Sequence, residues 1–254
     1  MLVTGAAGAI GAATARRIRE RWRDTRLALL DVEAGPLETL ARALGDASVH
    51  AVDLRAVDEL PGVVDDIARE LPLDGLVNCA GIMRVRHLAT WDWNAADELL
   101  AIDLLAPLRL QDLVVRGLVT RGERGTIVNI ASIAGKVPLR GCTYYGAAKA
   151  GLGMASEIAR ADLEEHGIRV VTVYPGPVRS ALEAGARSAY GGAGGGLFMR
   201  FAPVGDPAEL AERIVHAVET DEPRVIYPRV YNAGWSATPL ASWVALAYGP
   251  PPVE

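Results

Sequence analysis

The sequence predicts an α/β fold: a single doubly wound domain built on a parallel sheet of about seven strands. Short apolar segments alternate along the chain with longer helical segments, the order expected when helices cover both faces of a parallel sheet. A second observation concerns the residues that follow the apolar segments. Right-handed crossovers would bring these positions to one edge of the sheet, where such folds bind ligands: Gly8, Asp31, Asn78, Ser132, Tyr145 and Pro175.

The composition narrows the class of protein. The 254 residues are 50% hydrophobic and 22% charged, as in ordinary globular proteins. A net charge of −5 argues against a nucleic-acid partner held by charge. Cys79 and Cys142 are too few for a disulfide framework and favour a reducing compartment. With no visible signal peptide and no apolar run of transmembrane length, we expect a cytoplasmic protein without a membrane segment.

The chain opens with a strand, a glycine-rich turn and a helix. The strand is Leu2 and Val3, the turn covers 4–11, and the helix covers 12–23. Glycines let the backbone approach a pyrophosphate closely, and the helix N-terminus offers free N–H groups and a favourable dipole. The segment therefore predicts a Rossmann-type dinucleotide site, while a tight turn without a ligand stays open.

The second strand, 27–30, ends at an acidic residue. Asp31 lies twenty residues after Gly11, the spacing at which a carboxylate accepts hydrogen bonds from the adenosine ribose. A carboxylate there would repel a 2′-phosphate, and no cation in Ala6-Ala7 or 31–33 could hold one. NAD is therefore expected rather than NADP. The alternative is that Asp31 is a solvated loop acid.

The remaining elements follow the same alternation. We expect strands at 48–52, 75–77, 126–130, 169–174 and 224–227. We expect helices at 36–44, 58–70, within 91–118, from Tyr145 to about 166, and at 207–220, with a bend at Pro107. Glycines between about 181 and 205 indicate a mobile substrate loop, and 228–254 form a C-terminal extension.

The pair Tyr145 and Lys149 carries the chemistry. Residues four apart share one helix face, so a phenol and an ammonium would face the same space. The cation is expected to lower the phenol pKa and so allow proton exchange with an alcohol or ketone. Only Lys136 and Lys149 are lysines in a chain rich in arginine. The alternative is an ordinary amphipathic helix start.

Five motifs together resemble the short-chain dehydrogenase/reductase family over most of the chain. The turn 4–11 is similar to its TGxxxGIG loop, and 78–81 to its NNAG element, with Cys79 replacing an asparagine. Ser132 lies thirteen residues before Tyr145, the family's usual distance, and Tyr145 with Lys149 matches YxxxK. The segment 175–180 looks like the family's PG…T element, with Ser180 keeping the hydroxyl.

The resemblance implies which residues act. It gives the catalytic residues as Ser132, Tyr145, Lys149 and Asp103, and no metal. Asp103 stands where the family usually has an asparagine, which leaves its water relay in doubt. The same resemblance implies cofactor contacts from Gly5, Ala7, Gly8, Ala9, Ile10, Asp31, Asp53, Leu54, Asn78, Ala80, Gly81, Tyr145, Lys149, Pro175, Gly176, Val178 and Ser180.

The expected function is NAD-dependent interconversion of a secondary alcohol and a ketone. Phe198, Met199 and Phe201 indicate an apolar, steroid- or lipid-like substrate. Two other functions stay open: a dinucleotide-binding sensor without activity, and an isomerase or dehydratase on the same fold. Apolar residues on 99–118 and on the helix after Lys149, together with the resemblance, predict a homodimer or homotetramer.

Overall fold

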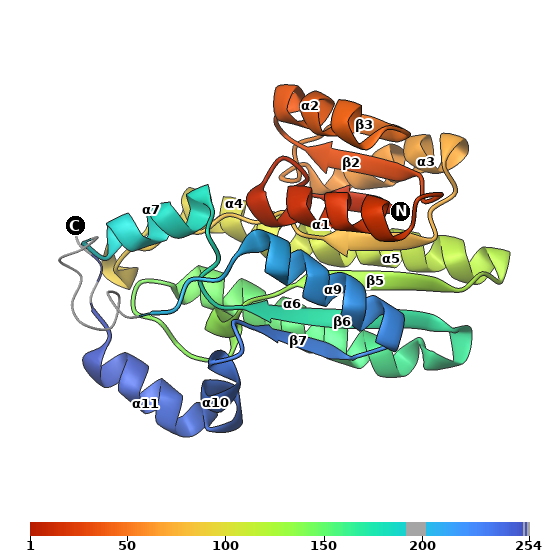
Figure 1. Cartoon of the computed structure of the whole chain (residues 1–254). Helices are drawn as coiled ribbons and strands as arrows, with labels where there is room; N and C mark the ends of the chain where they lie inside the picture. The colour runs from red at the N-terminus through yellow and green to blue at the C-terminus, as the bar shows by residue number, and fades with distance from the viewer. Residues whose placement is uncertain (192–201, 251, 253–254) are drawn as a thin grey trace.

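Seven parallel strands form one sheet in the computed structural model, which describes residues 1–191, 202–250 and 252 (Figure 1). The strand order is β3-β2-β1-β4-β5-β6-β7. The chain therefore runs outward from β1 to β3 and then returns to build the other half from β4, which places the switch point between β1 and β4. The strands are β1 Leu2–Thr4, β2 Leu27–Asp31, β3 Ala47–Ala51, β4 Gly75–Asn78, β5 Gly125–Ile130, β6 Ile168–Pro175 and β7 Arg224–Tyr227.

Helices cover both faces of the sheet, which confirms the doubly wound α/β prediction (Figure 1). Side chains of α1, α2 and α9 pack on one face, and those of α3, α5 and α6 on the other. The helices are α1 Ala9–Arg21, α2 Ala34–Leu44, α3 Leu60–Glu70, α4 Trp93–Leu100, α5 Ala106–Arg121, α6 Thr143–Asp162, α7 Ala181–Ala189, α9 Pro207–Thr220, α10 Tyr231–Ser236 and α11 Thr238–Tyr248.

Burial on both faces explains the continuous apolar runs of the strands. In β2, Leu29 packs with α1 and α2, while its neighbours Ala28 and Leu30 pack with α3 and α5. Because successive side chains of a strand point to opposite faces, a strand covered on both sides has no polar face to show.

The long helix predicted within 91–118 contains a widened turn. α4 continues into a π turn, Ala101–Leu105, and then into α5. The amide of Ala106 bonds the carbonyl of Ala101, five residues back. Pro107 has no N–H to offer the carbonyl of Asp103, so a regular α ladder is interrupted at this point. The predicted bend at Pro107 is thus a π turn that contains Asp103.

The predicted substrate loop and the C-terminal extension both contain helices. The predicted substrate loop begins with helix α7, while Phe198, Met199 and Phe201 lie outside the described residues. The extension 228–254 contains α10 and α11, which lie beyond the end of β7 (Figure 1). Among the described residues, no helix is both long enough and apolar enough to cross a membrane.

Candidate active site

The glycine loop lies against the end of β4 because it lacks side chains. Gly5 has a φ of +63°, and a Cβ there would lie 2.6 Å from the Cα of Ala80. A Cβ on Gly11 would lie 2.1 Å from the carbonyl oxygen of Gly5. Gly8 caps α1 without a side chain, and the first turn holds no acid. The N–H groups at Ala9 and Ile10 are therefore open to an anion, which fits a pyrophosphate.

Thr4 is a site residue that sequence reasoning missed. Its hydroxyl accepts hydrogen bonds from the amides of Cys79 and Ala80, at 3.1 and 3.2 Å, and donates to Val77. Thr4 is buried, and its hydrogen bonds join the segment after β4 to the glycine loop. A hydroxyl ending a fully apolar strand was the signal available, because a buried hydroxyl needs partners.

Asp31 lies beside the glycine loop, as its position at the end of β2 predicts. Its carboxylate accepts from the amide of Ala7 at 3.0 Å and from that of Val32 at 2.8 Å. No cation forms an ion pair with Asp31 within the described ranges. The carboxylate is therefore held in place at the loop without having its charge neutralised.

Two predicted cofactor contacts, Asp53 and Leu54, follow β3, and their side chains lie in different surroundings. Asp53 accepts from the side chain and the amide of Arg55, at 2.8 and 2.9 Å, and the side-chain hydrogen bond lowers its pKa. Leu54 is buried among side chains of α3 and α5. Leu54 could therefore meet a cofactor through its backbone only.

Asn78 points its side chain into the interior rather than into the cofactor site. Its amide nitrogen donates to the carbonyl of Pro107 at 3.0 Å and to Asn129 at 2.8 Å. Asn129 in turn donates to Gln111 and Ser156, both at 2.7 Å. This network joins β4, β5, α5 and α6 beneath the site, so the side chain of Asn78 has a structural position. A polar residue in the middle of the apolar run 126–130 was the signal for Asn129.

Ser132 and Tyr145 meet where β5 ends and α6 begins. The two side chains lie close enough for Ser132 to lower the pKa of the Tyr145 phenol, and both are 7% exposed. The Ser132 hydroxyl also accepts from the amide of Ala134 at 3.1 Å and lies 3.4 Å from the carbonyl of Pro175. A Cβ on Gly135 would lie 2.7 Å from the amide of Ala150, so this loop packs directly on the α6 backbone.

Tyr144 occupies a different environment from its neighbour. Its ring makes edge contacts with Trp91 and Trp93, with ring centroids 5.0 and 5.9 Å apart. Packing between aromatic rings accounts for Tyr144, whereas Tyr145 has a polar partner and a cation nearby: the ammonium of Lys149 lies 5.9 Å from its ring centre.

Lys149 is paired directly with Asp103. Its ammonium lies 3.1 Å from a carboxylate oxygen of Asp103 and donates to the carbonyl of Ile130 at 3.2 Å. The carboxylate also accepts from the amide of Ile82 at 3.2 Å. A Cβ on Gly81 would lie 2.5 Å from the same oxygen, so only glycine leaves room for this pair. Lys149 keeps one of its three donors for a ligand.

The acidity of Tyr145 differs from the sequence-based prediction. Burial raises the pKa of the phenol most; Lys149 lowers it, the Asp103 carboxylate raises it and Ser132 lowers it, and the net effect is a rise. Burial also raises the pKa of Asp103 to about 6, against the opposing effect of Lys149. The predicted lowering was wrong because burial disfavours the phenolate and the Asp103 carboxylate offsets part of the effect of Lys149.

The segment after β6 contains the other predicted cofactor contacts. The amide of Gly176 donates to the backbone carbonyl of Tyr227 at 2.7 Å, and a Cβ on Gly176 would lie 2.6 Å from the ring of Tyr231. Val178 is buried. The hydroxyl of Ser180 accepts from the amide of Glu183 at 3.1 Å and thus caps α7. Ser180 is placed near the site edge, but its hydroxyl is already used by the helix.

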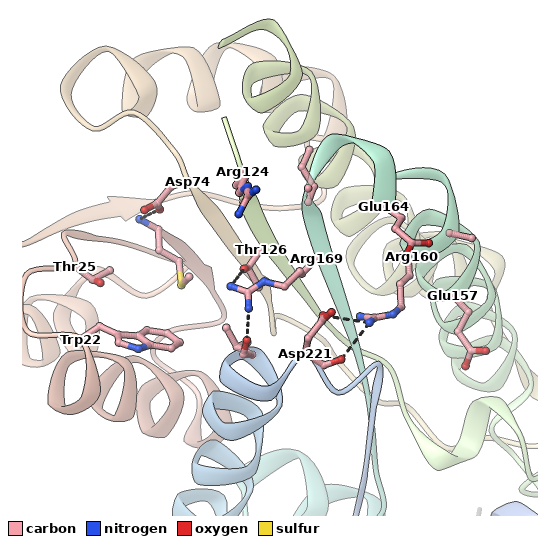
Figure 2. A pocket seen from close by; sticks show the side chains of 16 residues that line it. Trp22, Thr25, Asp74, Arg124, Thr126, Glu157, Arg160, Glu164, Arg169 and Asp221 are labelled. Atoms are coloured by element: carbon pink, nitrogen blue, oxygen red, sulfur yellow. Dashed lines mark hydrogen bonds and ion pairs between the residues drawn. The ribbon is translucent and has the colours of Figure 1, made fainter. Parts of the chain in front are cut away.

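A hollow of about 890 Å³ lies at the other edge of the sheet, where β5 and β6 begin. Figure 2 shows that two of its arginines are engaged by the protein: Arg169 donates to Thr126 and to the carbonyl of Val218, and Arg160 donates to Asp221. None of the predicted catalytic or cofactor residues lines this hollow. The reactive side chains are gathered at the opposite edge, after the strands.

Comparison with known proteins gives a consistent result. Residues 1–191 match the family model described as short chain dehydrogenase. The chain is 31% identical to the rat (3R)-3-hydroxyacyl-CoA dehydrogenase, covering 71% of this chain and 74% of the relative. It is 33% identical to the D-threitol dehydrogenase of Mycolicibacterium smegmatis, covering 84% and 83%. A short-chain dehydrogenase from Sphingobium yanoikuyae, solved with NADPH, superposes with a TM-score of 0.79 at 26% identity over 97% of this chain and 94% of that one.

Proposed function

We propose that this chain, which belongs to the short-chain dehydrogenase family, interconverts a secondary alcohol and a ketone with a nicotinamide dinucleotide. One observation carries the proposal. Ser132, Tyr145 and Lys149 lie together at the sheet edge, beside a glycine loop whose helix N-terminus is open to an anion.

The roles of the side chains follow from their chemistry. Ser132 and Tyr145 would hold the substrate oxygen, because each can donate one hydrogen bond to it. Tyr145 would exchange the proton of that oxygen, as a general base in oxidation and a general acid in reduction. Lys149 would bind the cofactor ribose with its remaining donor. The nicotinamide, when bound, supplies or accepts the hydride. Positioning and charge placement would provide most of the acceleration.

We favour NAD over NADP as the cofactor. Asp31 keeps an unneutralised carboxylate beside the glycine loop, where it would accept from ribose hydroxyls and repel a 2′-phosphate. Phosphate recognition normally uses an arginine at this place.

An apolar substrate agrees with the surroundings of Tyr145. Its ring lies in a cluster of buried apolar side chains that also contains Val85, Leu99 and Tyr190. The relatives act on quite different molecules, a hydroxyacyl-CoA and a sugar alcohol, so their names do not fix the substrate. A panel of secondary alcohols of increasing size, followed by NADH absorbance, would identify the class.

The test is a pair of tyrosine variants. Tyr145→Phe removes one hydroxyl and should reduce turnover by about 10²–10⁴-fold while leaving NAD binding intact. Tyr144→Phe changes a ring packed among tryptophans and should leave turnover close to that of the parent. Equal activity in the parent and in Tyr145→Phe would refute the proposal. NAD binding without any turnover would indicate a sensor, and product without a change in NADH would indicate an isomerase or dehydratase.

We also propose a homo-oligomer that works in the cytoplasm as a single nucleotide-binding domain. Exposed apolar side chains on α6, Met154 and Ile158, support the assembly. Cys79 and Cys142 are both free thiols, which suits a reducing compartment.

A further inference from the structure

The π turn and Pro107 give Asp103 a position that a regular helix would not. Asp103 is the middle residue of the turn, is completely buried, and meets Lys149 from across the site. The side chain of Lys149 is only 5% exposed as well. Burial of a charged pair is costly, so the pair persists only because each member is satisfied: Asp103 by Ile82 and Lys149, and Lys149 by Asp103 and Ile130.

Among the described residues, few ionisable groups face the pair or the Tyr145 phenol. Tyr145 of α6 and Cys79 after β4 face Lys149, and Cys142 before α6 faces Tyr145. Burial raises the pKa of both thiols, that of Cys79 to about 12, so neither carries charge at neutral pH. The charge near the Tyr145 phenol is therefore the sum of Lys149 and Asp103, which is zero when both are ionised.

We propose that Asp103 is a positioning residue that neutralises Lys149 and thereby keeps Tyr145 protonated through the neutral pH range, setting the site for proton donation to a carbonyl. This inference rests on the proposed function, since it concerns the same phenol. An uncharged residue at position 103 would leave the lysine charge uncompensated, and the phenol would then lose its proton at lower pH.

The test compares the parent with Asp103→Asn. Asparagine keeps an acceptor for Lys149 and Ile82 and removes only the charge. The midpoint of Tyr145 ionisation should fall by about one to two pH units, as expected for a unit charge several ångströms away in a protein interior. The readout is the ultraviolet absorbance of phenolate, taken as the difference between each protein and its own Tyr145→Phe version. This measurement needs no substrate, so it remains valid even if no alcohol is turned over.

Lys149→Met, together with the double variant, completes a double-mutant cycle. Lys149→Met removes the cation and leaves the carboxylate, so the midpoint of Tyr145 ionisation should rise above that of the parent. The double variant is neutral at both positions and should return towards the parent. Asp112→Asn, which removes an exposed carboxylate paired with Arg109 and Arg116 on α5, should leave the midpoint unchanged.

The outcomes separate the two proposals. An unchanged or higher midpoint in Asp103→Asn would overturn the charge-balancing role, whatever the activity. If Asp103→Asn does not fold, an unchanged or lower midpoint in Lys149→Met would overturn the role instead. A lowered midpoint in Asp103→Asn, with the pH profile of alcohol oxidation moved by the same amount, would support it. A lowered midpoint in Asp103→Asn, together with no turnover of any alcohol by the parent, would support the charge-balancing role of Asp103 and refute the dehydrogenase function.

Discussion

We propose that the choice of cofactor depends on a single carboxylate, that of Asp31. We predict that the parent protein binds NAD more tightly than NADP. Replacing Asp31 with alanine and Val32 with arginine should shift the preference towards NADP, because the variant loses a repulsive charge and gains a cation for the 2′-phosphate. Calorimetric titration with both cofactors measures the shift. The matched control is Glu33→Ala, an exposed acid two residues on. Tighter binding of NADP by the parent would contradict the role of Asp31.

For single residues, the sequence predicted that Tyr145 and Lys149 lie close together, but it did not predict the direction of the Tyr145 pKa shift. The spacing of Tyr145 and Lys149 is a property of one helix, so it could be seen directly in the sequence. Asp103 comes from another helix, and its distance from Lys149 depends on the π turn before Pro107. Local spacing holds no information about the burial of the phenol or about the contact with Asp103, and for these two reasons the expected direction of the Tyr145 pKa was wrong.

The polar network around Asn129 joins four elements and should contribute to stability. Asn129→Ala removes one partner each from Asn78, Gln111 and Ser156 in the interior. We predict a loss of about 2–3 kcal/mol in the free energy of unfolding, the usual cost of leaving buried polar groups unpaired. Urea denaturation measures this loss. Asn232→Ala on α10, an exposed asparagine, should change the free energy of unfolding little, and an equal effect in both variants would argue against the network.

The elements themselves were largely predictable, because buried parallel strands must be apolar throughout and glycine loops mark their ends. The strand order was not predicted, because the handedness of crossovers does not say which strands are neighbours. The interior position of the Asn78 side chain was not predicted either, because the resemblance implied that Asn78 contacts the cofactor.

The assembly is a property of the whole molecule. Met154 and Ile158, one turn apart on α6, are 60% and 53% exposed. Exposed apolar side chains on one helix face suit a contact between copies. We predict a dimer or tetramer by light scattering at micromolar concentration, and a smaller species after Met154→Glu with Ile158→Glu. The control is Val32→Glu, which changes an exposed apolar residue outside α6 and should leave the oligomer unchanged. A monomeric parent would contradict this prediction.

Trp235 is one of several side chains through which the C-terminal extension contacts the rest of the molecule. Trp235 of α10 packs on Tyr174, with ring centroids 4.4 Å apart, and lies near two cations, Lys136 at 4.9 Å and Arg224 at 5.2 Å. These contacts join residues from four distant parts of the sequence. The sequence predicted a C-terminal extension, but the partners of Trp235 could not be identified without the fold.

The burial of the Asp103–Lys149 pair has a consequence for the response to dissolved salt. Ions in solution weaken attractions between exposed charges, but they act far less on a pair that water does not reach. Surface pairs such as Arg116 with Asp112 should therefore lose strength as salt concentration rises, while the balance of charge beside Tyr145 stays constant. The acidity of the Tyr145 phenol should be nearly the same in dilute buffer and in concentrated brine.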